Sequence, residues 1–328
     1  MTRFLLRRTL SAVVLVLVLT AVVFVLQAVS PGDPVKAYLG ANASPSAVAA
    51  ERKTLGLDQP LPVQYLHYIV RALHGDLGIS LRTHRPVASD LHDFLPATIE
   101  LVLVAFVVAI LLGCLYAVSG SLRWPGGAFF RGPLLVLATA PPFLLALGGI
   151  ILFYAQLQVL PAAGRGADQS SPTGFLLVDS LLGGDVSEWA AAVQHLVLPA
   201  VILAIAPSIS IGRILRSSLD TTLASDHVRT ARAKGLTPLA VLGKHVVRNS
   251  LGPGLSMAGL QLGFMFAGVV VVEQVFSWPG IGNYLAASIP TSDFPAIAGV
   301  TLVLGIIYIV ANAVVDVLQA VADPRLTP

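Results

Sequence analysis

Six long stretches of this sequence lack Asp, Glu, Lys and Arg altogether. They are rich in Leu, Val and Ala, and they cover residues 9–32, 101–122, 132–164, 189–212, 249–272 and 294–315. An α-helix needs about 20 apolar residues to cross a hydrocarbon layer about 30 Å thick, and each stretch reaches that length. The sequence therefore predicts an all-α integral membrane protein with six transmembrane helices.

The composition excludes several other classes of protein. Charged residues make up 11% of the 328 residues, against about 25% in a typical soluble domain. This deficit argues against an ordinary soluble enzyme, a disordered chain and a nucleic-acid-binding protein. A further charge-free interval, 274–292, contains Trp278, two prolines and two glycines, and we expect it to be a loop. The first apolar run is longer than the core of a usual signal peptide, so we expect it to be retained as a span.

The basic residues are distributed unevenly about the six stretches. Thirteen of the 20 Lys and Arg residues fall in segments that six spans place on one side of the membrane, whereas the short loops opposite contain Arg165 alone. The positive-inside rule then places both termini in the cytoplasm. We divide the chain into residues 1–32 (cytoplasmic N-terminus and first helix), 33–95 (an external region with short helices) and 96–328 (a five-helix core with a cytoplasmic loop at 213–250).

The sequence of the external region predicts two short helices. Ser44 and Pro45 form a helix-start signal, and Gly56 is a stop. A second helix follows Pro62, with an apolar stripe that suits a helix lying on the membrane or on a neighbouring helix. Its members are Val63, Leu66, either Ile69 or Val70, and Leu73. His67 and His74 lie seven residues apart beside it, and without accompanying carboxylates or thiols we interpret them as solvated rather than metal-binding.

The loop at 213–250 predicts two short helices joined at a glycine. Asp226 is placed to cap a helix that runs to Lys234 and ends at Gly235, and Thr237 with Pro238 opens a second helix towards Arg248. Two small residues of the first helix are flanked by basic ones, a pattern that would let it seat in a groove of another protein. An alternative is that the basic side chains hold it among anionic headgroups. The residues concerned are Ala231, Ala233, Arg229, Arg232 and Lys234.

The spans contain breaks and one acid. Pro141 and Pro142 interrupt the third span, and Pro199 and Pro207 the fourth; such breaks often line a path through a membrane protein. Glu273 is an acid near the outer end of the fifth span, where it is either a functional group or solvated at the interface. We take Pro141, Pro142, Pro207 and Glu273 as candidates for a pathway or gate.

Small residues in the fifth span, Gly259, Gly263, Ala267 and Gly268, allow close helix packing. The sequence contains no phosphate-binding Gly-x-x-x-x-Gly-Lys-Ser/Thr loop and no His-Glu-x-x-His metal motif. A solute pathway in this chain would therefore draw its energy from an ion gradient or from a partner ATPase.

Several strings in the chain resemble the B-type permease subunit of bacterial dipeptide/oligopeptide ABC importers, in the binding-protein-dependent inner-membrane component family. They occur in order over almost the full length, at Pro31–Pro34, Gly56–Tyr65, Gly75–Gly78, Pro96–Leu101, Arg229–Leu236, Val272–Gly282 and Asp323–Arg325. Pro96 would open the second span. Arg229 and Thr230 depart from the Glu and Ala of the wider permease loop pattern, as is usual for the peptide branch.

The resemblance implies the permease fold of a type I ABC importer in the bacterial plasma (inner) membrane. Its partners would be a second, C-type permease subunit, two cytosolic ATPase subunits that bind ATP and Mg²⁺, and an external peptide-binding lipoprotein or periplasmic protein. The chain itself would be non-catalytic and free of cofactor or metal. The resemblance also implies that the segment from Asp226 to Gly235, including Thr230, couples the permease to an ATPase.

The same resemblance places Asp58, Asp76 and Trp278 towards the binding protein, on the outer side. Other cargoes stay open, since importers of this build can carry nickel, haem or another small solute. A gradient-driven secondary transporter is a further alternative, and it would predict buried ion pairs at mid-membrane depth and often inverted repeats. An intramembrane hydrolase would need a buried nucleophile and base, for which no motif stands out.

Overall fold

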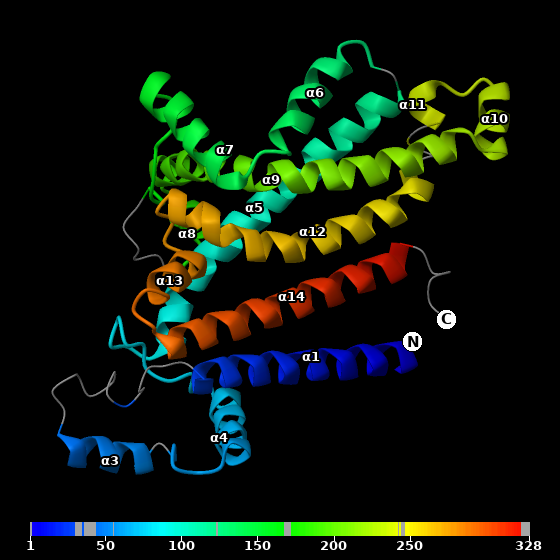
Figure 1. Cartoon of the computed structure of the whole chain (residues 1–328). Helices are drawn as coiled ribbons and strands as arrows, with labels where there is room; N and C mark the ends of the chain where they lie inside the picture. The colour runs from blue at the N-terminus through cyan, green and yellow to red at the C-terminus, as the bar shows by residue number, and fades with distance from the viewer. Residues whose placement is uncertain are drawn as a thin grey trace.

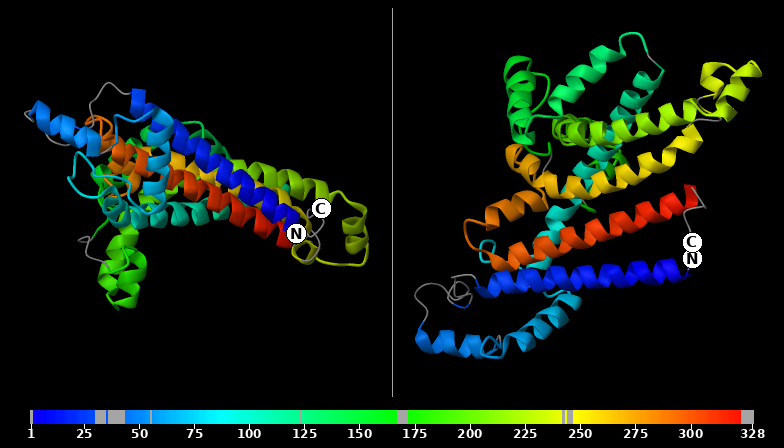
Figure 2. Two further views of the ribbon diagram at one scale, coloured as in Figure 1. Left: turned by 90° about the horizontal axis from the view of Figure 1, so that it is seen from below. Right: turned by 45° about the vertical axis from the view of Figure 1, so that its right-hand side comes forward.

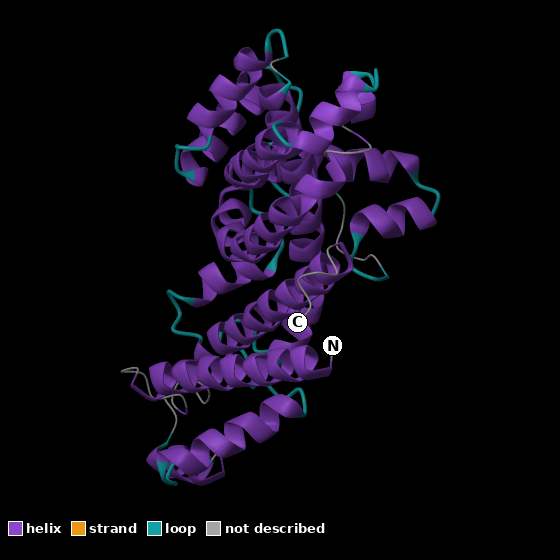
Figure 3. Cartoon of the chain, turned by 90° about the vertical axis from the view of Figure 1, so that its right-hand side faces the viewer, coloured by secondary structure: helices purple, strands orange, loops and turns teal. Residues whose placement is uncertain are grey.

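The computed structural model describes residues 2–29, 35, 44–54, 56–122, 124–166, 172–241, 243 and 247–322. Across these ranges the backbone is helical or irregular, and an isolated bridge between Ile79 and Pro86 is the β pairing found there. Figure 3 shows this helical character directly. The predicted all-α fold class is confirmed.

Five helices of the described chain are long and apolar enough to cross a membrane singly. They are α1 (Thr2–Val29), α5 (Val87–Ser121), α9 (Val186–Leu223), α12 (Val247–Val275) and α14 (Phe294–Ala322). Each contains or overlaps one predicted interval, so five of the six spans are confirmed as single helices. Two of them are much longer than a bilayer requires, at 35 residues for α5 and 38 for α9.

The third predicted span is a bent pair of helices. α6 (Gly127–Leu137) is followed by α7 (Pro142–Gly149), which continues into a π-helical stretch at Ile150–Gln156, and the two limbs meet at 114°. The break falls at Pro141 and Pro142, as expected where two consecutive residues lack a backbone N–H. Six spans are obtained when this pair is taken as one.

The long helices lie side by side, with α9, α12, α14 and α1 in succession and α5 crossing behind them (Figure 1). Both termini and two short helices, α10 (Asp226–Ala233) and α11 (Pro238–Val241), are at one end of the bundle. Three other short helices, α3 (Pro45–Thr54), α8 (Leu176–Leu182) and α13 (Ile281–Ser288), are at the other end. The two views in Figure 2 show the same arrangement of the long helices and of the two ends.

Glycines set the closest helix approaches in the bundle. A Cβ on Gly113 of α5 would lie 2.9 Å from the carbonyl oxygen of Ser208 on α9, so these two backbones come together where no side chain fits. A Cβ on Gly259 would overlap Val315, and one on Gly263 would overlap Tyr308. The prediction that small residues of the fifth span permit close packing is therefore confirmed for these two positions. Gly268, by contrast, faces open space.

Two expectations about the helix boundaries are wrong. The interval 274–292 is not all loop, because α13 occupies Ile281–Ser288; its Ile281 and Tyr284 are buried against α5 and α14, so tertiary contacts support a helix that Pro and Gly alone did not suggest. Pro96 does not open the second span, since α5 begins at Val87. The first turns of α5 pack through Val87 and Leu91 into the same cluster, which holds them helical ahead of the proline.

The two helices of the predicted external region follow the sequence signals. Ser44 accepts a hydrogen bond from the N–H of Ala47 at 3.2 Å, at the start of α3, and Gly56 adopts a φ of 68°. α4 (Leu61–Leu73) starts with Pro62 at its second position. These two helices are confirmed where the sequence predicts them.

We predict that Gly259→Ala destabilises the protein and that Gly268→Ala does not. The first adds a methyl group where Val315 already lies, and overpacking of this kind costs about 1–3 kcal/mol. The second adds it in open space and gains helix propensity. Thermal unfolding of both variants in detergent, compared with the parent chain, checks this; equal midpoints for the two would contradict the packing of α12 on α14.

Candidate functional site

The segment from Asp226 to Val241 forms two short helices at the end of the bundle that carries the termini (Figure 1). Gly235 has a φ of 81°, and the N–H of Leu236 donates to the carbonyl of Ala231 at 3.4 Å, which is the Schellman arrangement of a helix end. The hydroxyl of Thr237 accepts from the N–H of Ala240 at 3.3 Å, at the start of α11. The predicted bend at glycine is confirmed; residues 242 and 244–246, on the way to Arg248, lie outside the described ranges.

Asp226 is not the cap of α10 but its first residue. The carbonyl of Ser225 accepts the first helical hydrogen bond, from the N–H of Arg229, so Ser225 holds the capping position. The Asp226 carboxylate lies 3.6 Å from the Arg229 guanidinium, with both side chains largely exposed. An acid in the first turn still interacts favourably with the helix dipole.

α10 has a buried face and an exposed face. Val228 and Ala231 are 0% and 5% exposed, and they belong to an apolar cluster with Leu215 and Leu219 of α9, Ala117 of α5 and Val241 of α11. The expectation that Ala231 seats in another protein is therefore wrong, because its methyl group is covered by this chain. The opposite face exposes His227, Arg229, Thr230, Ala233 and Lys234. Arg232 belongs to α10, and its side chain lies outside the described set.

At the other end of the bundle Glu273 is fully buried, at 0% exposure. The Thr98 hydroxyl donates to its Oε1 at 2.6 Å, and the N–H of Asn283 donates to its Oε2 at 2.9 Å. A Cβ on Gly280 would overlap the carboxylate, so this glycine is required for its close approach to the N-terminus of α13. The alternative of a solvated interfacial acid is wrong for Glu273, because α5 and α13 enclose it.

Thr98 connects three segments through one hydroxyl group. Besides donating to Glu273, its oxygen accepts from the N–H of Ile281 at 2.9 Å. One residue earlier, the carbonyl of Ala97 accepts from the indole N–H of Trp278 at 3.0 Å. Two of the strings on which the family resemblance rests are thus parts of one contact.

Trp278 does not face outwards. Its side chain is 0% exposed and lies in the largest apolar cluster of the bundle. The prediction that it faces a binding protein is wrong, because its indole is used to join the 276–280 segment to α5. Asp58 and Asp76 are exposed, and Asp76 accepts from the N–H of Gly78 at 3.0 Å.

A buried ion pair beside this contact was not predicted from the sequence. The guanidinium of Arg165 donates to Glu100 and, at 2.8 Å, to the carbonyl of Gly174. It also lies 5.9 Å from the centre of the Trp278 ring. Glu100 accepts a further bond from the N–H of Leu177 at 2.8 Å. In the sequence, Arg165 is only one cation in an otherwise acidic loop. Its partner Glu100 lies 65 residues away, so spacing does not reveal the pair.

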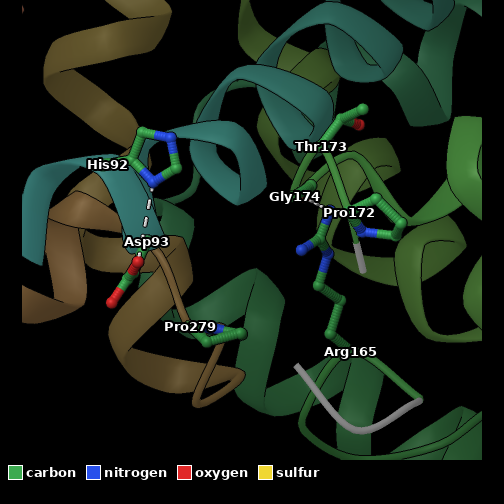
Figure 4. A pocket seen from close by; sticks show the side chains of 7 residues that line it. All are labelled: His92, Asp93, Arg165, Pro172, Thr173, Gly174 and Pro279. Atoms are coloured by element: carbon green, nitrogen blue, oxygen red, sulfur yellow. Dashed lines mark hydrogen bonds and ion pairs between the residues drawn. The ribbon is translucent and has the colours of Figure 1, made fainter. Parts of the chain in front are cut away.

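A cleft of about 210 Å³ opens next to Arg165. Figure 4 shows Arg165 and Thr173 on one side of it and His92 and Asp93 on the other, with Pro279 between them. The His92 ring nitrogen Nδ1 is 3.6 Å from the Asp93 carboxylate. The cleft therefore presents groups of both charges to the outside.

Two further buried acids fasten the 75–86 segment to the bundle. The Ser80 hydroxyl donates to Asp293 at 2.5 Å, at the start of α14. The Thr83 hydroxyl donates to Asp90 at 2.5 Å, and Arg85 lies 3.3 Å from the same carboxylate. Each bond joins residues from different elements, so spacing along the sequence gave no sign of them.

The proline candidates are not gathered into one site. Pro141 and Pro142 are exposed at the bend, whereas Pro207 is buried in α9. The bend packs through Leu145 against Ile205 of α9. Their role in a pathway stays a prediction. His67 and His74 are exposed, and within the described ranges no three His, Cys, Asp or Glu side chains are placed to hold a metal ion.

Sequence comparison with known proteins gives matches that together cover the chain. Residues 94–328 match the family described as binding-protein-dependent transport system inner membrane component, and residues 1–102 match the model of its N-terminal region. The chain is 40% identical to the probable D,D-dipeptide transport system permease protein DdpB of Escherichia coli, over 93% of this chain and 92% of that one. It is 35% identical to the dipeptide transport system permease protein DppB of Alkalihalophilus pseudofirmus, over 99% of both chains. It is 39% identical to the di/tripeptide transport system permease protein DppB of Pseudomonas aeruginosa, over 94% and 93%.

We predict that Thr98→Val destabilises the end of the bundle that contains Glu273 and that Thr98→Ser does so much less. Valine has nearly the shape of threonine but leaves both the Ile281 N–H and one Glu273 oxygen without this partner. Buried groups left unpaired cost about 1–3 kcal/mol each, whereas serine keeps the hydroxyl. Thermal unfolding of the purified variants measures the difference, and an equally stable Thr98→Val variant would show that the hydroxyl bridge is dispensable.

Proposed function

This chain belongs to the binding-protein-dependent transport system inner membrane component family, and on that premise we propose that it passes di- and oligopeptides across the bacterial plasma membrane. As a member of the family it is a permease subunit of an ABC importer. Support for peptides as the cargo comes from relatives that are named as dipeptide and di/tripeptide permeases and that align over nearly the full chain.

The proposed assembly supplies what this chain lacks. A second, C-type permease subunit would complete the membrane part, two cytosolic ATPase subunits would bind ATP and Mg²⁺, and an external binding protein would deliver the peptide. In this arrangement the permease changes shape and performs no covalent chemistry. The alternative of a gradient-driven secondary transporter loses support, because the family consists of components of binding-protein-dependent transport systems.

The observation that carries the coupling role is the two-faced packing of α10. Its apolar face, Val228 and Ala231, rests on α9 and α5, while its exposed face carries Arg229, Thr230 and Lys234. A partner that moves the exposed face must also move α9 and α5, because the buried face has no free space. This supports docking on an ATPase over adsorption to headgroups, since adsorption would not require the helix to be fixed to the bundle.

The two ends of the bundle fit opposite steps of a transport cycle. We infer that closure of the ATPases pushes α10 and tilts the bundle from an inward-open to an outward-open form, after which the binding protein releases the peptide. At the opposite end, α13 is bonded to α5 through Glu273, Thr98 and Ile281, and these bonds would hold the outer side closed until that step.

Charge and fold together support one orientation in the membrane. α10 is at the same end of the bundle as both termini (Figure 1), and most of the basic residues of the sequence are in segments at that end. We therefore place this end in the cytoplasm. The exposed Asp58 and Asp76 are then on the outer side, where the binding protein docks.

The reconstituted complex should take up labelled dipeptide only when ATP is inside and the binding protein outside. The reason is that this chain has a path but draws its energy from the ATPases. Uptake of labelled dipeptide into vesicles, with nickel and haem as alternative cargoes, is the measurement. If nickel or haem is transported and dipeptide is not, peptide is the wrong cargo, and uptake without ATP under an ion gradient would overturn the importer mechanism.

Gly235→Pro should abolish uptake, whereas Gly235→Asn should retain most of it. Proline cannot adopt the φ of 81° found here, while asparagine tolerates the left-handed conformation. No heavy atom within 4 Å would contact a Cβ at this position, so the contrast tests backbone conformation rather than crowding. The measurement is ATP-driven dipeptide uptake, at matched levels of membrane-inserted protein.

A cross-link in living cells provides the control for this prediction. A cysteine at the exposed Ala233, in a background without Cys114, should cross-link to an ATPase subunit. Normal uptake by Gly235→Pro, or no cross-link from position 233, would show that α10 is not the coupling element. The cross-link also tests the orientation, because the ATPases are cytosolic.

A further inference from the structure

α4 presents three distinct faces, of which one is apolar and uncovered within the described structure. Tyr65 and Tyr68 contact α1, with ring centres 5.4 Å and 6.1 Å from that of Phe24. A polar edge carries Gln64, His67 and Arg71. The third edge exposes apolar side chains with large free fractions, at 59% for Leu66, 45% for Val70 and 81% for Leu73.

The contact with α1 fixes the depth of α4 in the membrane. The Tyr65 hydroxyl donates to the carbonyl of Leu17 at 2.9 Å and lies 3.0 Å from the Thr20 hydroxyl. Thr20 comes nine residues before Val29, or about 14 Å from the end of α1 at 1.5 Å per residue. Thr20 lies inside the apolar window Thr9–Leu26, of which only 6% is buried in the protein. α4 therefore adjoins a part of α1 that is apolar and that the described part of this chain leaves largely uncovered.

The polar edge of α4 faces away from the membrane centre. The Gln64 amide donates to the carbonyls of Leu57 and Gln59, at 3.0 Å and 2.7 Å, in the turn that leads from α3. Figure 1 shows α3 beyond the Val29 end of α1. Leu66 and Leu73 are roughly half a turn around the helix from Gln64, at about 100° per residue. The apolar edge is thus directed towards the hydrocarbon.

We propose that α4 lies in the outer leaflet of the bilayer, with Leu66, Val70 and Leu73 among the acyl chains and Arg71 at the headgroups. An amphipathic helix with an apolar edge and a basic, polar edge is the form that binds in this way. The occupant is lipid rather than protein because α4 packs on the apolar window of α1, and that window is long and apolar enough to cross a membrane and largely uncovered by the described part of this chain. The exposed acids Asp58 and Asp76 flank α4 on either side in the sequence, so the anchored helix sets their height above the membrane.

Single cysteines on α4 test this placement in the assembled transporter. In a Cys114→Ala background, Leu66→Cys and Leu73→Cys are labelled with an environment-sensitive fluorophore, and His67→Cys on the polar edge is the matched control. The complex is reconstituted in phosphatidylcholine–phosphatidylglycerol vesicles, and quenching by nitroxide-labelled lipid is compared with quenching by iodide in solution. All three substitutions replace exposed side chains, and gel-filtration profiles check that each variant folds.

Lipid placement requires that positions 66 and 73 be quenched several-fold more by nitroxide lipid than position 67, with the reverse order for iodide, and that the binding protein leave this pattern unchanged. Quenching of 66 and 73 by iodide to the same extent as 67 would show a water-exposed stripe. Protection from both quenchers would show a protein partner on this edge. Either result overturns the proposal, and neither bears on whether the chain transports peptide, because the assay needs no transport.

Discussion

A backbone inside hydrocarbon has no water to bond with, and this constraint shapes the whole molecule. The long helices meet it by themselves. The irregular stretch after α12 meets it through the protein, since the carbonyl of Phe276 accepts from the N–H of Gly164 at 2.8 Å and the N–H of Trp278 donates to the carbonyl of Glu273 at 2.8 Å. Non-helical backbone at this end is therefore tied to neighbouring segments rather than left to the lipid.

Among the described residues, the buried acidic side chains gather at that same end. Glu273, Glu100, Asp90 and Asp293 are all buried, and donors from other elements bond to each of them. Removing one member leaves a charge or an N–H group unpaired in a low-dielectric site, which is strongly destabilising. A conformational change that opens this end has to break or exchange several of these bonds. That property suits the proposed transport cycle, in which this end would be the outer side and would open only in an energy-driven step.

The end of the bundle that carries α10 is built differently. Its ion pairs, such as that between Arg229 and Asp226, are between exposed side chains, and such pairs contribute little to stability. α10 is held instead by apolar contacts of Val228 and Ala231 and by the glycine at its end. Between the two ends, α5 and α9 approach closely at Gly113 and Gly212, where a Cβ on Gly212 would lie 3.0 Å from the carbonyl oxygen of Gly113. A displacement of α10 would therefore act on α9, which is closely packed on α5.

The residue types and their local spacing in the sequence determined many of the helices and their breaks. The charge-free intervals determined the spans, because the cost of burying charge in lipid depends on each residue alone. The glycine and proline signals likewise determined the bend at Gly235, the break at Pro141 and Pro142, and the helices α3 and α4. What only the tertiary structure decided were relations between distant residues: the burial of Glu273 and Trp278, the pairing of Arg165 with Glu100, the helix at Ile281–Ser288, and the face of α10 that carries Ala231. Each depends on which distant segments pack against one another, and the spacing of residues along the sequence does not determine that.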